Sequence, residues 1–247
     1  MIVAPLPARP SSLRGYRRSV VFLSTQISLL GVLSSVGLVV ALHFLRPDLN
    51  PTRRFISDYA IGPHGMLMNL AFWACGLGML ALVVGLYFGV AQEGRSWAGL
   101  ALLTVSGVCI LVATLFHDAP QASPAIVLDT VHDSIVQISL FSLALAALTW
   151  SIRFRRDKTW RVFARLALPM ALMMLLALLG FILTPTRFLG LSERILLGLY
   201  LVWVCGVLVK LESLVPLPEI RLRRLEFSTG ELAASWHSPE GQAPSSP

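Results

Sequence analysis

The sequence predicts an all-α fold: a polytopic membrane protein in which six transmembrane helices form a bundle, with both termini in the cytoplasm. Hydrophobic residues make up 55% of the 247 residues and charged residues only 13%, whereas a soluble domain carries about 25% charged residues. A helix needs about 20 mostly apolar residues to cross the hydrocarbon core of a bilayer. Six segments meet this requirement, at residues 20–45, 66–90, 97–116, 126–152, 162–184 and 191–211.

The distribution of basic residues predicts how this bundle is oriented. Of the 20 Lys and Arg residues, the side opposite the termini receives only Arg46, Arg53, Arg54, Arg187 and Arg194. Basic residues concentrate in cytoplasmic loops, so we expect both termini inside and a multi-pass protein of the cell (plasma) membrane. The net charge of +7 then sets the orientation and attracts anionic membrane lipids. It does not indicate a nucleic-acid partner.

The chain divides into three parts. Residues 1–19 form a short basic tail, residues 20–211 form the transmembrane domain, and residues 212–247 form a second cytoplasmic tail. This second tail is rich in Pro, Ser and Gly towards its end, so we expect it to be largely disordered. We find no soluble second domain in the sequence.

Small residues mark the faces along which neighbouring helices pack, because they let two helix backbones approach closely. Two such stripes occur at helical spacing: Ser24, Ser28, Gly31 and Ser35 in the first segment, and Ala81, Gly85 and Gly89 in the second. The short link at residues 91–96 makes the second and third helices an antiparallel hairpin. We expect Ser192 to cap the N-terminus of the sixth helix.

The most polar stretch of the membrane domain lies between the third and fourth segments, where His117 precedes several carboxylates. Asp129 and Asp133 are four residues apart, so they share one helix face, and His132 lies about 100° from Asp133. Ionisable groups near membrane depth are costly unless they pair or face a cavity. Together with polar residues of two other loops on the same side, they define a candidate polar cluster: Ser57, Asp58, Asp118, Asp129, His132, Asp133, Glu193 and Arg194.

Three short motifs resemble those of a known family, the domain of unknown function 998 (DUF998) family of six-helix integral membrane proteins. They are ISDYAIG at residues 56–62, His132 near the start of the fourth helix, and GLSER at residues 190–194. The resemblance extends over roughly residues 19–211, and it implies a six-helix membrane fold with an outward-facing polar cluster. It implies no reaction. The family tends towards Phe-Pro before an aspartate, where this chain has Phe116-His117-Asp118, so His117 is not assigned a family-wide role.

We favour a structural interpretation of the cluster, in which charged groups pair across helix ends and brace an extracytoplasmic pocket. Asp58 beside Glu193 and Arg194 suits this interpretation, because buried charges persist when they are paired and hydrogen-bonded. We also predict that His132 points into the bundle, towards Asp58 and the start of the sixth helix.

Two alternatives remain open. In the first, the protein is a metal-assisted membrane hydrolase acting on a lipid or envelope substrate. His64, His117 and His132 would bind a divalent metal such as zinc, with a water molecule in the open coordination position. No motif of paired metal ligands supports this assignment.

In the second alternative, the protein is a non-catalytic lipid- or partner-binding membrane subunit. Its outward pocket would receive a lipid headgroup or small ligand, or the bundle would associate with another membrane protein or with a second copy of itself. A transporter is less favoured, because the six segments carry no acidic or basic residue at mid-membrane depth of the kind that marks an ion path.

Overall fold

The computed structural model describes residues 11–116 and 125–215, with side chains at residues 15–116 and 130–215. This part of the chain is helical and contains no strand. Its six long helices are α1 (Ser11–Leu45), α2 (Gly65–Gly89), α3 (Trp97–Ala113), α4 (Ala125–Phe154), α5 (Arg161–Leu183) and α6 (Leu189–Ser213). Four short 3-10 turns connect them: η1 (Ser57–Ala60), η2 (Gln92–Gly94), η3 (Thr114–Phe116) and η4 (Thr186–Phe188). All six long helices are long and apolar enough to cross a membrane, which confirms the predicted all-α bundle of six spanning helices. The cytoplasmic location of both termini stays a prediction.

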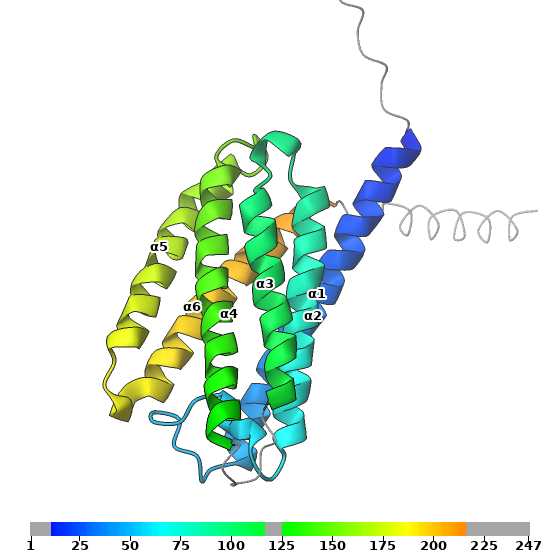
Figure 1. Ribbon diagram of the computed structural model, residues 1–247. Coiled ribbons are helices and arrows are strands. Elements are labelled where there is room, and N and C mark those ends of the chain that lie inside the picture. The colour runs from blue at the N-terminus through cyan, green and yellow to red at the C-terminus, as the bar shows by residue number, and fades with distance from the viewer. Residues whose placement is uncertain (1–10, 117–124, 216–247) are drawn as a thin grey trace, which may run out of the picture. The chain divides into compact units, whose positions relative to one another are not determined.

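The helices pack in the order of the chain, and contacts between α1 and α6 close the ring. In Figure 1, α6 runs obliquely behind α3 and α4. It contacts α1, α2, α4 and α5, so it is the helix with the most neighbours. The loop after α1 and the start of α6 lie at the same end of the bundle (Figure 1).

The closest helix contact joins α1 to α2. A Cβ atom added to Gly31 would lie 2.9 Å from the Cα atom of Gly78 and closer still to the carbonyl oxygen of Ala74. No larger residue than Gly fits this crossing without moving one backbone. Further along, a Cβ atom on Gly85 would lie 3.2 Å from Ser24 Oγ. The predicted stripe on α1 therefore faces α2 at Ala74, Gly78 and Gly85, of which Gly85 belongs to the predicted stripe of α2.

Two helix starts differ from the prediction. α1 begins at Ser11, nine residues before the apolar run. The basic segment at residues 11–19 contains no Pro and a single Gly, Gly15, so it can continue the same helix. The prediction that Ser192 caps α6 is wrong. α6 begins at Leu189 after Phe188, and Ser192 lies inside the helix, where its Oγ donates to the carbonyl of Leu189 at 2.9 Å.

At the opposite end of the bundle, Asp157 organises the turn between α4 and α5. Its Oδ2 accepts from the backbone N–H of Ala91 at 2.8 Å. Its Oδ1 accepts from the backbone N–H of Thr159 at 2.8 Å and from the Thr159 hydroxyl at 2.6 Å. Burial opposes ionisation of this carboxyl, but these hydrogen bonds outweigh burial, and the pKa of Asp157 lies below its ordinary value. The carboxylate thus ties the α2–α3 link to the α4–α5 turn.

Replacing Asp157 with Ala should destabilise the fold by about 1–3 kcal/mol, because three donors lose their acceptor. The contribution of Asp157 has a defined pH dependence. Since the folded pKa is depressed, the stabilisation is complete above the ordinary value of 3.8 and is lost as the pH falls through the lower folded pKa. Thermal unfolding in detergent as a function of pH measures both effects. The exposed neighbour provides the control: Lys158→Ala should leave the melting temperature unchanged, and an equal loss in both variants would contradict the assignment.

Candidate functional site

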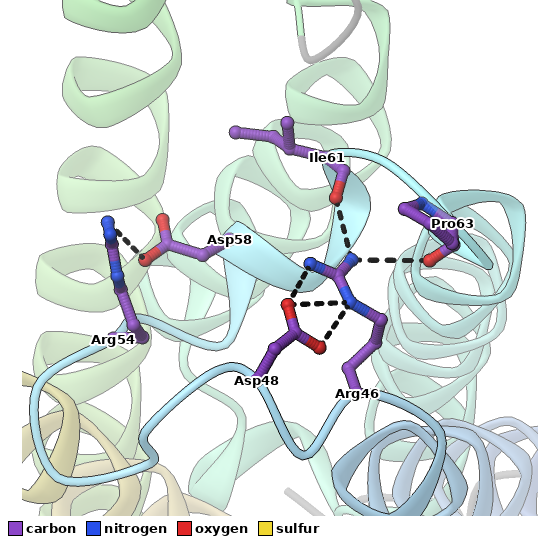
Figure 2. Close-up of polar contacts among 6 residues, drawn as sticks. All are labelled: Arg46, Asp48, Arg54, Asp58, Ile61 and Pro63. Atoms are coloured by element: carbon purple, nitrogen blue, oxygen red, sulfur yellow. Dashed lines mark hydrogen bonds and ion pairs between the residues drawn. The ribbon is translucent and has the colours of Figure 1, made fainter.

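Arg46 closes the base of the loop that joins α1 to α2 (Figure 2). Its Nε donates to Asp48 Oδ1 at 2.9 Å and its Nη2 to Asp48 Oδ2 at 2.8 Å. Its Nη1 donates to the carbonyl oxygens of Ile61 at 2.8 Å and Pro63 at 3.2 Å. The hydrogen bonds between the two side chains lower the pKa of the Asp48 carboxyl and raise the pKa of the Arg46 guanidinium. Arg46 therefore holds the two ends of the loop together.

Between its ends, the loop is bound to the first turns of α6. The backbone N–H of Ile56 donates to Glu193 Oε2 at 2.7 Å, and the backbone N–H of Leu191 donates to the carbonyl of Thr52 at 3.0 Å. Ile56 and Glu193 are both buried. A hydrogen bond from an N–H group to a carboxylate is stronger than one between neutral groups. We call this contact region, residues 52–58 against residues 190–194, the loop–α6 junction.

Arg194 adds three hydrogen bonds to the junction. Its Nη1 donates to the carbonyl oxygens of Arg54 at 2.8 Å and Gly190 at 2.9 Å, and its Nε donates to His43 Nε2 at 3.1 Å. A His nitrogen that accepts carries no proton, so the proton of the His43 ring lies on Nδ1, which donates to the carbonyl of Val39 at 2.7 Å. The His43 ring is therefore neutral in this arrangement.

Asp58 binds to its own loop. Its Oδ2 accepts from the backbone N–H of Phe55 at 3.2 Å and lies 3.9 Å from Arg54 Nη1 (Figure 2). The adjacent Ile56, Tyr59 and Ala60 are buried in a small hydrophobic cluster that continues into α1 and α2. Asp58 thus stabilises the turn that carries Ile56 to Glu193.

The other half of the predicted cluster is only partly described. His132 is buried, as predicted, and its Nδ1 lies 3.1 Å from the carbonyl oxygen of Ala113 at the end of α3. Asp133 is exposed. Asp118 and His117 lie outside the described residues, as does the side chain of Asp129.

An apolar cavity of about 350 Å³ lies within the bundle, next to the loop–α6 junction. Its walls come from α1, α2, α3, α4 and α6, whereas α5 contributes none of the lining residues. Most of the surface belongs to aliphatic side chains such as Leu140 and Leu197. Glu193 and Arg194 are the charged residues that line it, with Ser57 beside them. The predicted cluster residues at the junction therefore form one polar end of an otherwise apolar cavity.

α1 and α6 meet by side-chain hydrogen bonds near the two ends of α6. At one end Arg194 donates to His43, and at the other Gln26 Nε2 donates to Glu212 Oε1 at 3.5 Å. The cavity-lining residues of both helices lie between these two contacts along the chain.

The cavity is open sideways between α1 and α6. Its lining includes Val36 and Val40 of α1, which are 39% and 51% exposed, and Gly198 of α6. A Cβ atom added to Gly198 would meet no atom within 4 Å. Because both helices are long and apolar enough to span a membrane, this opening lies on a surface suited to lipid. We call it the α1–α6 opening.

The described residues contain no group of three or more His, Cys, Asp or Glu side chains able to bind a metal. His64 precedes α2 in the left-handed backbone conformation, with a φ of 65°, and His132 packs against α3. His117, the remaining residue of the proposed zinc site, lies outside the described residues.

Two functional positions escaped prediction. His43, the acceptor for Arg194, is a single imidazole at the end of the apolar run of α1, and an isolated histidine gives no signal of its partner. In the sequence, Arg46 was used only as one of the basic residues that predict the orientation. Asp48 lies two residues further on, in a loop with several prolines, and this spacing is the signal that could have indicated that Arg46 holds the two ends of the loop together.

The fold and the site define an integral membrane protein: a six-helix bundle with an apolar cavity, one polar end of which is held by a loop bound to α6. A model of the family described as protein of unknown function (DUF998) matches residues 29–210, so the chain belongs to this family. Comparison with curated proteins and with solved structures gives no match.

Replacing Gly190 with Ala should destabilise the protein by about 1–3 kcal/mol, the usual cost of overpacking. A Cβ atom at this position would collide with the carbonyl oxygens of Arg54 and Pro51, so the loop would have to leave α6. Thermal unfolding in detergent measures the loss. Gly198→Ala is the matched control in the same helix: its Cβ meets open space, and Ala is the better helix former. Equal destabilisation by both substitutions would show that the junction is not a close contact.

Proposed function

We propose that the protein is a non-catalytic lipid-binding membrane protein. The cavity holds the chain of an amphipathic membrane lipid, and the loop–α6 junction braces the polar end of that cavity. The observation that carries this proposal is the cavity itself: about 350 Å³ of apolar space with Glu193 and Arg194 at one end. Binding sites for small molecules occupy roughly 300–1,000 Å³ and combine an apolar lining with a few convergent polar groups.

The position of the cavity supports a lipid rather than a water-soluble ligand. The α1–α6 opening is bordered by Val36, Val40 and Gly198, which offer no hydrogen bonds from their side chains to a polar molecule crossing it. An unfilled apolar space loses the dispersion contacts of its lining atoms. A lipid chain moving sideways from the bilayer restores these contacts without passing through water.

We further propose that the loop–α6 junction faces the outside of the cell membrane and that the α4–α5 turn faces the cytoplasm. The excess of basic residues on the side of the α4–α5 turn supports this orientation. The metal-assisted hydrolase stays an alternative, and a divalent metal present in equal amount to the purified protein would favour it.

The orientation can be tested by labelling single cysteines with a reagent that does not cross membranes. Arg53→Cys in the loop and Lys158→Cys in the α4–α5 turn replace exposed basic residues. In intact cells only the cysteine at position 53 should react, and both should react after the membrane is opened. The background is the unsubstituted chain, whose Cys75, Cys109 and Cys205 lie in spanning helices. Labelling at position 158 alone would reverse the orientation.

Lipid binding is tested by extracting and quantifying the lipid that remains with detergent-purified protein. Gly198→Trp should reduce the retained lipid at least severalfold, because the indole fills the α1–α6 opening. Gly180→Trp is the matched control: this glycine of α5 is also exposed, has no atom within 4 Å of an added Cβ, and lies away from the cavity. No retained lipid in the wild type, or equal retention in the two variants, would refute the proposal.

A further inference from the structure

We propose that the cavity selects a lipid with a single chain and a headgroup that has no net charge and presents an oxygen acceptor to Arg194. This inference rests on the proposed lipid-binding function and identifies the class of ligand. Four properties of the site lead to it: the small gain from moving a lipid chain, the volume of the cavity, an unsatisfied guanidinium nitrogen, and the balance of the two charges that line the cavity.

The chain alone cannot provide selectivity. Moving apolar surface out of water yields about 25 cal/mol per Å², but a chain that enters from the bilayer leaves surroundings as apolar as the cavity wall. Little hydrophobic free energy separates the two positions. Discrimination among membrane lipids must therefore arise from volume and from the polar end.

The volume favours one chain. A cavity of about 350 Å³ lies near the lower limit of the range for small-molecule sites. Two chains joined at one headgroup would have to be accommodated side by side within it. A single chain can extend from the junction towards the α1–α6 opening.

Arg194 supplies an unused donor at the polar end. Its Nη1 and Nε are occupied by the carbonyl oxygens of Arg54 and Gly190 and by the His43 ring. Its Nη2 is buried and has no hydrogen-bond partner among the described residues. An unsatisfied buried donor is costly, and more so when the group is charged. Arg194 lines the cavity, but its Nη2 has almost no accessible surface. A small turn of the guanidinium would bring Nη2 to an oxygen of the bound headgroup, and that acceptor would remove the cost.

The two charges that line the cavity cancel. The wider junction also carries Arg53, Arg54 and Asp58, but none of these lines the cavity. The His43 ring that accepts from Arg194 is neutral. Of the charged pair that lines the cavity, Glu193 offsets Arg194. An anionic headgroup would bring a second negative charge to Glu193, and a cationic one would meet Arg194. Like charges brought together in a water-poor site repel strongly. An uncharged hydroxyl or ester oxygen avoids both penalties.

The test compares three probes with the same saturated chain: a monoacylglycerol, which is uncharged, a lysophosphatidate, which is anionic, and an alkylammonium, which is cationic. Binding to the full-length protein is measured in nanodiscs of a zwitterionic phospholipid, by displacement of radiolabelled monoacylglycerol. We expect the uncharged probe to bind about tenfold more tightly, or better, than either charged probe.

Glu193→Gln changes the charge and keeps the contact, because the Gln carbonyl can still accept from the N–H of Ile56. This variant should shift the preference towards lysophosphatidate by about tenfold relative to wild type. Glu212→Gln makes the same substitution at the other end of α6, at an exposed position, and should leave the preference unchanged.

The outcomes separate the two proposals. Binding of the probes with no headgroup preference, or with a preference for either charged one, overturns the selectivity inference and leaves lipid binding intact. An unchanged preference in a folded Glu193→Gln variant also overturns it. If that variant does not fold, the ranking of the three probes by the wild type decides. If the wild type binds no probe and retains no extractable lipid, the lipid-binding function itself fails.

Discussion

The hydrogen bond from the Ile56 amide to the Glu193 carboxylate is the contact on which the loop end of the bundle depends. Both residues are buried, so neither group can exchange its partner for water. The remaining contacts act around this bond: Arg46 fixes the two ends of the loop, and Arg194 binds the loop backbone at Arg54. Bracing and ligand binding are therefore compatible, because the same residues that hold the loop also form the polar end of the cavity.

The spans and the family could be predicted because both depend on local sequence. Long apolar runs allow few folds other than transmembrane helices, and short motifs identified the segments that meet at the junction. The neighbours of His132 could not be predicted in the same way, and its direction towards Asp58 and the start of α6 stays a prediction. Its place on α4 was correct and its burial is observed, but the carbonyl that it contacts belongs to Ala113 of α3. A helix periodicity indicates which residues share a face and leaves open which neighbour that face meets.

The cavity was beyond sequence analysis for a physical reason. Its walls are mostly apolar residues, with Val and Leu the commonest, and such residues have the same pattern whether they face a helix, a lipid or an internal space. No polar residue in the sequence marks the α1–α6 opening. In sequence, Gly198 cannot be distinguished from a glycine that packs against a neighbouring helix. The acid–base pair at positions 193 and 194 was recognised, but its link to His43 depends on a contact between helices that are far apart in the chain.

The length of α1 has a consequence for how the bundle fits its bilayer. The helix begins with the basic segment at residues 11–19, and its apolar part, residues 20–45, is about 39 Å long at 1.5 Å per residue. A hydrocarbon core is about 30 Å thick. A helix longer than the core accommodates hydrophobic mismatch by tilting, at a cost of fractions of a kcal/mol per Å. The crossing of Gly31 and Gly78 brings the backbones of α1 and α2 together without interlocking side chains. It therefore provides a pivot about which α1 can change its tilt in membranes of different thickness while the crossing itself is preserved.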